Sequence, residues 1–400
     1  MTRVCSLFLA SLLNVCAFGQ RFSIVNPIDV LRTDELIVLT RSDVEKRFPK
    51  AISFKTLAVL GQDGRYTPLQ TDDLDGDGKW DEAAFLCDMP PNATLRFELT
   101  DIKANAVLLY PRAHVRLRKK MSGQKYGDNL PIEVMPPQHA PTDFSTTALP
   151  LYLTEGPAWE NDKVAFRQYF DTRNARDIFG KTTAQMMMDT VGTDPGMSYH
   201  TKKDWGMDIL KIGDSPGAGG LLFRSTIDNK KLERLSGEKV KKTVYKKIAD
   251  GPMRAIFAME YEIELYGKTV NVIETTQIWG GQYFYESNAT ISGLPANTVV
   301  FAGMANPFKL SSTRRGRSVQ THGIQSENND ILGMALLTNR TNNTPVVDDG
   351  KILLELPDNK FRSYACWEQT NARFKSREYF EDFIEIEEQK MLAPTSIRWE

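Results

Sequence analysis

Two runs of alternating polar and apolar residues, joined at a glycine, constrain the fold of this chain more than any other feature. The segment EYEIELYGKTVNVIETTQIW, residues 260–279, carries this alternation on both sides of Gly267 and Lys268. A period of two is typical of half-buried strands, and a two-residue turn led by glycine joins antiparallel strands into a hairpin. We therefore expect antiparallel β-structure here.

The same character extends over most of the sequence. Between residues 20 and 110 short apolar runs such as ELIVLT, KTLAVLG, AAFLCDM and TLRFELT are separated by clusters of Gly, Asp, Asn and Pro. This spacing predicts a small N-terminal β-sandwich. Residues 111–150 are basic and rich in proline and show neither period, so we expect them to link the domains or wrap around the second one.

Residues 151–400 are again rich in strand patterns, and a length of 400 residues with 41% hydrophobic residues favours two domains. The stretch SREYFEDFIEIEEQK near the C-terminus is the one that resembles a helix. Ser376 can cap it, and Tyr379, Phe380, Phe383 and Ile384 form an apolar stripe. The predicted fold class is all-β, with a small N-terminal sandwich followed by a large antiparallel one.

The first nineteen residues have the pattern of an export signal. Arg3 precedes an apolar run that ends in Ala17-Phe18-Gly19, a small-x-small motif of the kind that signal peptidase accepts. We expect residues 1–19 to be a cleaved signal peptide, which makes the periplasm the expected location, with secretion or surface attachment as alternatives. Cleavage removes Cys5 and Cys16, and the two remaining cysteines exclude a disulfide scaffold.

Charge and hydropathy exclude several classes of partner. The chain has 50 basic and 51 acidic residues, so no long-range field attracts nucleic acid or an anionic membrane. No segment after the signal is apolar and long enough to cross a bilayer. An anionic ligand must therefore be bound by locally placed Arg and Lys.

One acidic turn has the spacing of a calcium loop. In DDLDGDGKWDE, residues Asp73, Asp75, Asp77 and Asp81 take the first, third, fifth and ninth places, with Gly78 at the sixth. The twelfth place, which usually holds a bidentate glutamate, is Ala84. The sequence therefore favours an Asp/Gly-rich turn between strands, with a structural calcium ion as the alternative and no other cofactor expected.

The stretch from residue 164 to 183 contains two patterns of unequal value. ARDIFGKT has the spacing of a phosphate-binding loop, but its Arg, Asp, Ile and Phe are not the small residues whose backbone can cradle a phosphate. The preceding VAFRQYFDTR has a period of two. It places Val164, Phe166, Gln168 and Phe170 on a core face and Ala165, Arg167, Tyr169, Asp171 and Arg173 on the other. This second face predicts a ligand cleft, with a salt-bridged outer strand face as the alternative.

A second polar stretch, SYHTKKDWGMDILKIG, follows at residues 198–213. It combines His200, one of four histidines, with Tyr199 and with Trp205, whose ring can stack on a sugar. No His or Cys spacing suggests catalytic zinc, and no Gly-x-Ser-x-Gly elbow suggests a serine hydrolase.

These two stretches carry a resemblance to a known family. EGPAWENDKVAFRQYFDTRNARDIFGK and YHTKKDWGMDILKIG, together with DLDGDGKWDE and ACWE at residues 365–368, resemble an exported bacterial family classified only as a domain of unknown function. Its genes lie in polysaccharide-utilisation loci. The resemblance covers most of the mature chain and implies a small N-terminal β-domain followed by a galactose-mutarotase-like β-supersandwich.

The resemblance also implies carbohydrate processing. One branch of the family is similar to oligosaccharide dehydratases of ulvan breakdown, which remove water from a non-reducing-end glucuronic or iduronic acid and leave a 4,5-unsaturated uronate. That reaction needs a base at C5, a donor for the departing oxygen and a cation for the carboxylate. The candidate catalytic residues are Arg167, Tyr169, Arg173, Tyr199 and His200. The candidate substrate-binding residues are Trp159, Glu160, Asp171, Asp204, Trp205 and Lys211.

The assignment of base and acid stays open, and so do three other functions. A glycoside hydrolase would use two carboxylates from Glu160, Asp171, Asp204 and Asp208. A mutarotase or epimerase would move a proton without loss of water. A non-catalytic glycan-binding protein would keep the aromatic residues alone. The expected partner is an anionic oligosaccharide, and the oligomeric state is not determined by the sequence.

Overall fold

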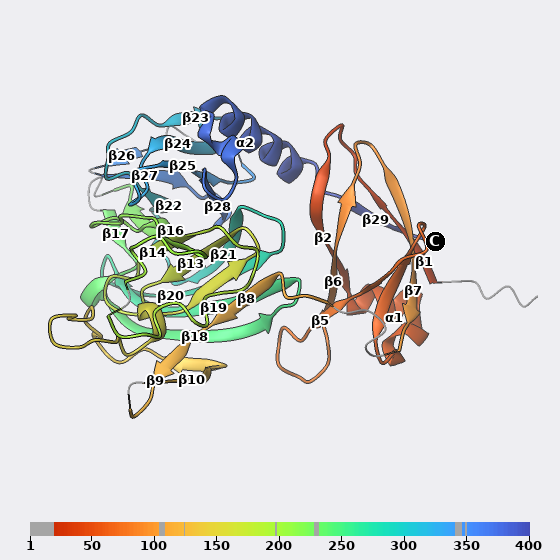
Figure 1. Cartoon of the computed structure of the whole chain (residues 1–400), viewed down its shortest axis with the longest axis horizontal. Coiled ribbons are helices and arrows are strands. Elements are labelled where there is room, and N and C mark those ends of the chain that lie inside the picture. Colours follow the sequence, from red (N-terminus) through yellow and green to blue (C-terminus); the bar gives the residue numbers. More distant parts are fainter. Residues whose placement is uncertain are drawn as a thin grey trace, which may run out of the picture.

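The computed structural model describes residues 20–103, 109–123, 125–196, 198–227, 232–340, 346–348 and 350–400. The expected signal peptide, with Cys5 and Cys16, lies outside these residues. The predicted all-β class is confirmed, because strands dominate both lobes of the molecule and the described residues include only two α-helices (Figure 1). Neither helix is long and apolar enough to span a membrane.

The smaller lobe is a sandwich of two antiparallel sheets. Its core contains Phe22, Ile37, Phe85 and Leu99 from both sheets. The five-stranded sheet has the order β29 (Ser396–Trp399), β1 (Gln20–Val25), β7 (Thr94–Asp101), β3 (Leu57–Gly61) and β4 (Tyr66–Pro68). The three-stranded sheet has the order β2 (Arg32–Thr40), β6 (Glu82–Met89) and β5 (Gln70–Asp72). Helix α1 (Arg41–Arg47), which the sequence pattern did not predict, follows β2.

The larger lobe is built from one large antiparallel sheet and two smaller ones. The nine-stranded sheet has the order β11 (Ile132–Val134), β18 (Val240–Asp250), β19 (Arg254–Leu265), β20 (Lys268–Trp279), β21 (Phe284–Ser292), β28 (Lys360–Trp367), β25 (Ile331–Leu337), β24 (Ser318–Ile324) and β23 (Thr313–Arg315).

The second sheet has the order β15 (Gly206–Asp208), β14 (Arg176–Lys181), β13 (Val164–Gln168), β12 (Ala158–Asn161) and β8 (Ala113–Arg116). The third has the order β17 (Leu232–Arg234), β16 (Ala218–Ser225), β22 (Thr298–Ala305), β27 (Lys351–Glu355) and β26 (Val346–Asp348). A ribbon of β9 (Arg118–Lys120) and β10 (Tyr126–Asn129) lies apart. One core joins all three sheets: it contains Trp159 and Phe166 from the second sheet, Phe257 and Val272 from the nine-stranded sheet, and Ala302 from the third.

Two local sequence predictions are confirmed in detail. Strands β19 and β20 form the expected hairpin, but Leu265 pairs with Lys268, so the turn is Tyr266-Gly267, one residue earlier than expected. Both turn residues have left-handed backbone angles, with φ of 49° and 76°, as the favoured two-residue hairpin turn requires.

The C-terminal helix also forms. Helix α2 (Arg377–Leu392) begins at the expected cap, where the Ser376 hydroxyl accepts the backbone N–H of Tyr379. Its Phe380 ring lies directly over Gly333 of β25, where any side chain on the strand would collide with it. The helix therefore packs tightly on the nine-stranded sheet (Figure 1).

Two segments determine where the lobes meet along the chain. Residues 111–150, expected to link the domains or to wrap around the second one, contribute to the larger lobe, because β8 pairs with β12 and its Ala113 and Val115 are buried in the large core. The chain end does not stay with the large domain, since β29 returns to pair with β1, as Figure 1 shows for its blue strand among orange ones. Buried ion pairs join the lobes: Arg254 of β19 lies 2.7 Å from Asp72 and 2.6 Å from Glu82.

Candidate functional site

The alternation predicted for residues 164–173 is real, but its polar face is covered. In β13, Val164 and Phe166 point into the large core, while Ala165 packs on the other face against Met187, Met188 and Val191. The strand ends at Gln168, so Asp171 and Arg173 lie in the turn that follows. The polar face of the strand therefore lies inside the protein and not on an open cleft.

Arg167 is the centre of a buried polar cluster. Its side chain is fully buried, and its Nη2 atom contacts the carboxylates of Asp177 and Asp208, the latter at 3.4 Å. Its Nη1 atom donates to the carbonyl oxygen of Thr154 at 2.5 Å and lies 3.3 Å from Oε2 of Glu155. Its Nε atom has no hydrogen-bond partner among the described residues. Because the side chain has no exposed surface, the structure favours a role for Arg167 in positioning its neighbours over the binding of a substrate carboxylate that we expected.

Tyr169 is held between two guanidinium groups. The Cζ atoms of Arg167 and Arg173 lie 3.8 Å and 3.5 Å from its ring centroid, and Arg167 donates a hydrogen bond of 2.9 Å to its hydroxyl oxygen. Burial raises the pKa of Tyr169 above its usual value. Arg173 lies 2.5 Å from Asp171 and 2.6 Å from Glu155, yet its side chain keeps 30% of its surface exposed. Arg173 is thus the guanidinium of the pair that solvent reaches.

Two carboxyl groups share one cation in this cluster. Burial, and then the neighbouring carboxyl of Asp177, raise the pKa of Asp208 well above its usual value, although Arg167 opposes them. Burial also raises the pKa of Asp177, whose Oδ1 atom has no hydrogen-bond partner among the described residues. Two carboxyls on one guanidinium cannot both ionise easily without solvent. The cluster therefore favours the protonated form of one of these two carboxyl groups.

The backbone beside Arg167 is strained. Thr154 and Glu155 both have left-handed φ angles, 48° and 64°, which cost energy for residues other than glycine. The turn is held by a second buried arginine: Arg116 donates to the carbonyl oxygens of Leu153 and Gly156 at 2.8 Å and 2.9 Å. The strained turn carries Glu155, whose side chain contacts Arg173, Arg167 and Tyr199.

A pocket opens next to this cluster. Its volume is about 390 Å³, and it lies between the segment from Phe144 to Pro150 and the loop that carries Tyr199 and His200. The rings of these two residues are adjacent, with centroids 4.8 Å apart. His200 is about half exposed, and its Nδ1 atom lies 2.9 Å from Glu327 and 3.9 Å from Asp208. The Tyr199 hydroxyl donates to Glu155 at 3.5 Å, and burial raises its pKa to about 12.

His200 thus lines the pocket and also lies next to Asp208 of the buried Arg167 cluster. A histidine held by carboxylates with an exposed ring can take up a proton from a ligand, and a phenol that stays protonated can give one up. The arrangement can therefore perform acid–base chemistry on a ligand in the pocket.

Several expected substrate-binding residues lie elsewhere. Trp159 is entirely buried against Phe166 and Phe257, because its strand pairs place the ring in the core, so it offers no stacking face. Glu160 is buried too, bound to Lys181 at 2.6 Å and to the backbone N–H groups of Met187 and Met188. These two contacts make its role structural.

The remaining expected residues are spread out. Trp205 stacks on Phe179 at 6.3 Å and is partly exposed, and Asp171 is bound to Arg173. Asp204 and Lys211 are exposed and line none of the pockets described. The stretch from residue 198 to 213 therefore contributes Tyr199, His200 and Asp208 to the site, and its other polar residues serve the surface.

Three residues of the cluster were not proposed from the sequence. Asp177 pairs directly with Arg167 across β13 and β14. The alternation of residues 176–181 could have predicted this strand, but we considered the segment only as a possible phosphate-binding loop. Glu155 is the first residue of the long motif. Glu327 has no local signal, because it lies 127 residues from the histidine that it contacts.

The acidic turn of the small lobe is partly assembled. Carboxylate oxygens of Asp73, Asp75 and Asp81 lie within 4.8 Å of one another, and Asp77 is outside this group. The Asp73 oxygens accept backbone N–H groups of Gly76 and Gly78 at 2.7 Å and 2.8 Å. These bonds, led by that of Gly78, lower the pKa of Asp73. Asp73 thus also stabilises the turn through its backbone hydrogen bonds.

Fold and site define a two-lobed, all-β protein with a pocket beside a buried acid–base cluster. Residues 24–397 match the family model described as a domain of unknown function, DUF4861, and the chain belongs to this family. This match confirms the expectation from the two long motifs that the chain belongs to a family classified only as a domain of unknown function. No curated protein matches the chain.

Two solved structures share the fold. One is an alpha-mannosidase from Enterococcus faecalis V583, with a TM-score of 0.53 and 10% identity over 95% of this chain and 46% of that one. The other is a protein of glycosyl hydrolase family 38 from Enterococcus faecalis, with a TM-score of 0.51 and 9% identity over 96% of this chain and 47% of that one. The chain spans less than half of their length.

Proposed function

We propose that this protein is a carbohydrate-processing enzyme that removes water from the non-reducing-end uronic acid of an ulvan-type oligosaccharide. The observation that carries the proposal is the adjacent pair of Tyr199 and His200 on the wall of a 390 Å³ pocket. The sequence motifs resemble a family of which one branch is similar to ulvan dehydratases, and the fold is shared with two carbohydrate-active proteins; both support carbohydrate as the substrate class.

Each step of the elimination has a group in the site. His200, bound to Glu327 and close to Asp208, takes the proton from C5. The electron pair of the C5–H bond forms the C4–C5 double bond while the C4–O bond breaks. Tyr199 gives its proton to the departing oxygen, which leaves as water. Proton exchange between the two adjacent rings restores the starting state.

The carboxylate of the substrate needs a cation as charge develops on it. Arg173 fits this role better than Arg167, because its side chain is 30% exposed and Arg167 has no exposed surface. Glu155 joins Arg173 to Tyr199, with contacts of 2.6 Å and 3.5 Å. Through Glu155 the Arg173 guanidinium and the Tyr199 hydroxyl are held at fixed positions relative to each other.

Two proton carriers also suit the two possible substrates. In glucuronate the C5 proton and the C4 hydroxyl lie on the same side of the ring, and in iduronate they lie on opposite sides. An enzyme that accepts both needs groups that reach both faces, which a pair of side chains provides more readily than one. We further propose that the protein acts after export, with the periplasm as its location.

The test is the incubation of purified protein with saturated, uronate-ended ulvan oligosaccharides. Mass spectrometry should show the loss of one water, and ultraviolet absorbance should show the conjugated double bond. His200→Ala should lower the rate roughly a hundredfold or more, and Tyr199→Phe should act in the same direction. Both variants should keep their melting temperature, since His200 is half exposed.

Tyr110→Phe is the matched control for Tyr199→Phe, because Tyr110 is 78% exposed and lies outside the pocket. Its rate should equal that of the wild type. Shortening of the oligosaccharide without unsaturation would instead identify a hydrolase. Binding without any product would identify a glycan-binding protein and overturn the proposal.

A further inference from the structure

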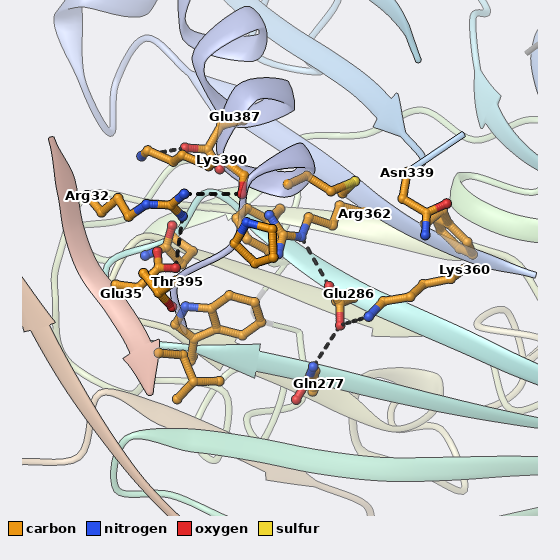
Figure 2. A pocket seen from close by; sticks show the side chains of 17 residues that line it. Arg32, Glu35, Gln277, Glu286, Asn339, Lys360, Arg362, Glu387, Lys390 and Thr395 are labelled. Atoms are coloured by element: carbon orange, nitrogen blue, oxygen red, sulfur yellow. Dashed lines mark hydrogen bonds and ion pairs between the residues drawn. The ribbon is translucent and has the colours of Figure 1, made fainter. Parts of the chain in front are cut away.

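A second polar cavity lies where the two lobes and helix α2 meet. Its volume is about 360 Å³, within the range of roughly 300–1,000 Å³ typical of small-molecule sites. Figure 2 shows Arg32 and Glu35 of β2 on one side and Glu387 and Lys390 of α2 above them. Strands β20, β21 and β28 form the opposite wall. Any ligand in this cavity would contact both lobes.

The charges that line the cavity do not cancel. The basic side chains are Arg32, Lys360, Arg362 and Lys390, and the acidic ones are Glu35, Glu286 and Glu387. Four cations face three carboxylates, which leaves one positive charge. A partly buried charge without a counterion is costly, so this excess favours a monoanionic ligand.

The uncompensated positive charge lies at one part of the cavity wall. Arg32 pairs with Glu35 at 2.9 Å, and Lys390 pairs with Glu387 at 2.8 Å. Glu286 instead lies between two cations, 3.0 Å from Lys360 and 3.1 Å from Arg362, as the dashed lines of Figure 2 show. The single carboxylate neutralises only one of them.

An aromatic ring lies beside this triad. Trp279 is only 6% exposed and lines the cavity. Its ring centroid is 5.7 Å from the guanidinium carbon of Arg362. A ligand carboxylate next to Arg362 and Lys360 would supply the counterion that this part of the wall lacks.

We infer that this cavity binds a sugar acid, a polyhydroxylated ring with one carboxylate. The carboxylate lies beside Lys360 and Arg362. The cavity is larger than an inorganic anion requires. Its Gln277 and Asn339 amides and the Thr395 hydroxyl match ring hydroxyls, which favours a sugar acid over a simple carboxylate. This site is separate from the pocket at His200 and does not depend on the reaction proposed there.

The test is calorimetric titration of the full chain carrying His200→Ala, with D-glucuronate as the probe. Glucose lacks the carboxylate and acetate lacks the ring, and both should bind at least about tenfold more weakly than glucuronate. Lys360→Gln should weaken glucuronate binding by about tenfold or more. Because the ligand contacts both lobes, it should also raise the melting temperature.

Lys246→Gln is the matched control. Lys246 and Lys360 have the same side-chain exposure, 44%, and each pairs with one glutamate, but Lys246 lies on β18 away from the cavity. Its glucuronate affinity should be unchanged. Equal binding of glucose or acetate, equal effects of the two lysine variants, or the absence of glucuronate binding would each overturn the inference. None of these outcomes bears on whether intact protein dehydrates an oligosaccharide.

Discussion

Two polar clusters of the molecule have opposite imbalances of charge. Around Arg167, two guanidinium groups face four carboxyl groups, those of Glu155, Asp171, Asp177 and Asp208. In the cavity between the lobes, four cations face three carboxylates. Both clusters are largely buried, so solvent cannot compensate either imbalance fully.

The difference lies in how each imbalance can be relieved. A carboxyl group can keep a proton, and burial together with the Asp177 carboxyl raises the pKa of Asp208 accordingly. Arg and Lys cannot lose their protons as easily, and the pKa of Arg362 is raised further by Tyr364 and Glu286, although burial alone would lower it. An excess of carboxyl groups therefore favours proton transfer, and an excess of Arg and Lys side chains favours the binding of an anion.

The largest effect should follow the removal of the cation that the acidic cluster shares. Arg167→Met leaves the buried carboxyls of Asp177 and Asp208 without their counterion. Breaking a buried ion pair in this way costs about 3–5 kcal/mol. Urea unfolding should show this loss. The control is Arg21→Met, since Arg21 is 61% exposed in its pair with Glu98 and should cost under about 1 kcal/mol. Equal, small losses would mean that Arg167 is not the centre of the cluster.

A smaller effect should follow the removal of a carboxylate from the cavity between the lobes. Burial alone would raise the pKa of Glu286, but Arg362 and Lys360 outweigh it, and the pKa lies below its usual value. The stabilisation from this carboxylate is therefore present at neutral pH and lost as the pH falls through the folded-state pKa. Glu286→Gln should cost about 1–3 kcal/mol at neutral pH. The difference from wild type should shrink in acid, as urea unfolding at two pH values can show.

The same replacement in the acidic cluster should cost less. Asp208 has a raised pKa, so its folded form keeps a proton that the unfolded chain releases above about pH 4. Wild-type stability should therefore fall as the pH rises from that value towards the folded-state pKa. Asp208→Asn removes this dependence, so the variant should gain stability relative to wild type as the pH rises from about 4 towards neutral. If it destabilised the protein as much as Glu286→Gln, Asp208 would be ionised and the contrast between the clusters would fail.

Local patterns allowed the hairpin, helix α2 and the two faces of β13 to be predicted. The period of two, the Ser376 cap and the glycine of the turn act within a few residues, so they are legible in the sequence. The covering of the β13 polar face depends on a separate segment that contains Met187 and Met188. No pattern within β13 reveals that, and this is why Arg167 was expected to face a ligand.

The candidate site was predictable to the extent that it is local. Tyr199, His200 and Arg173 come from the two motif stretches. Glu327 joins His200 only through the tertiary fold. The cavity between the lobes had no sequence signal, because β2, β20, β21, β28 and α2 each contribute a few residues that look like ordinary surface charges.

The smallest effect concerns a third cluster, the acidic turn at Asp73, Asp75 and Asp81. Its carboxylates are close together, as calcium would require, but the turn is mostly open to water, which compensates the charge without an ion. Backbone N–H groups already occupy the Asp73 oxygens, and Asp81 accepts the N–H of Leu74 at 2.7 Å. Ala84, at the place of the usual bidentate glutamate, is buried in β6 and supplies no ligand. Chelator and millimolar calcium should therefore give melting temperatures within about 1 °C of each other, since a ligand stabilises only by binding the folded state. A melting temperature that falls with chelator and recovers with calcium, but not with magnesium, would show that exposed carboxylates in this protein also recruit a counterion.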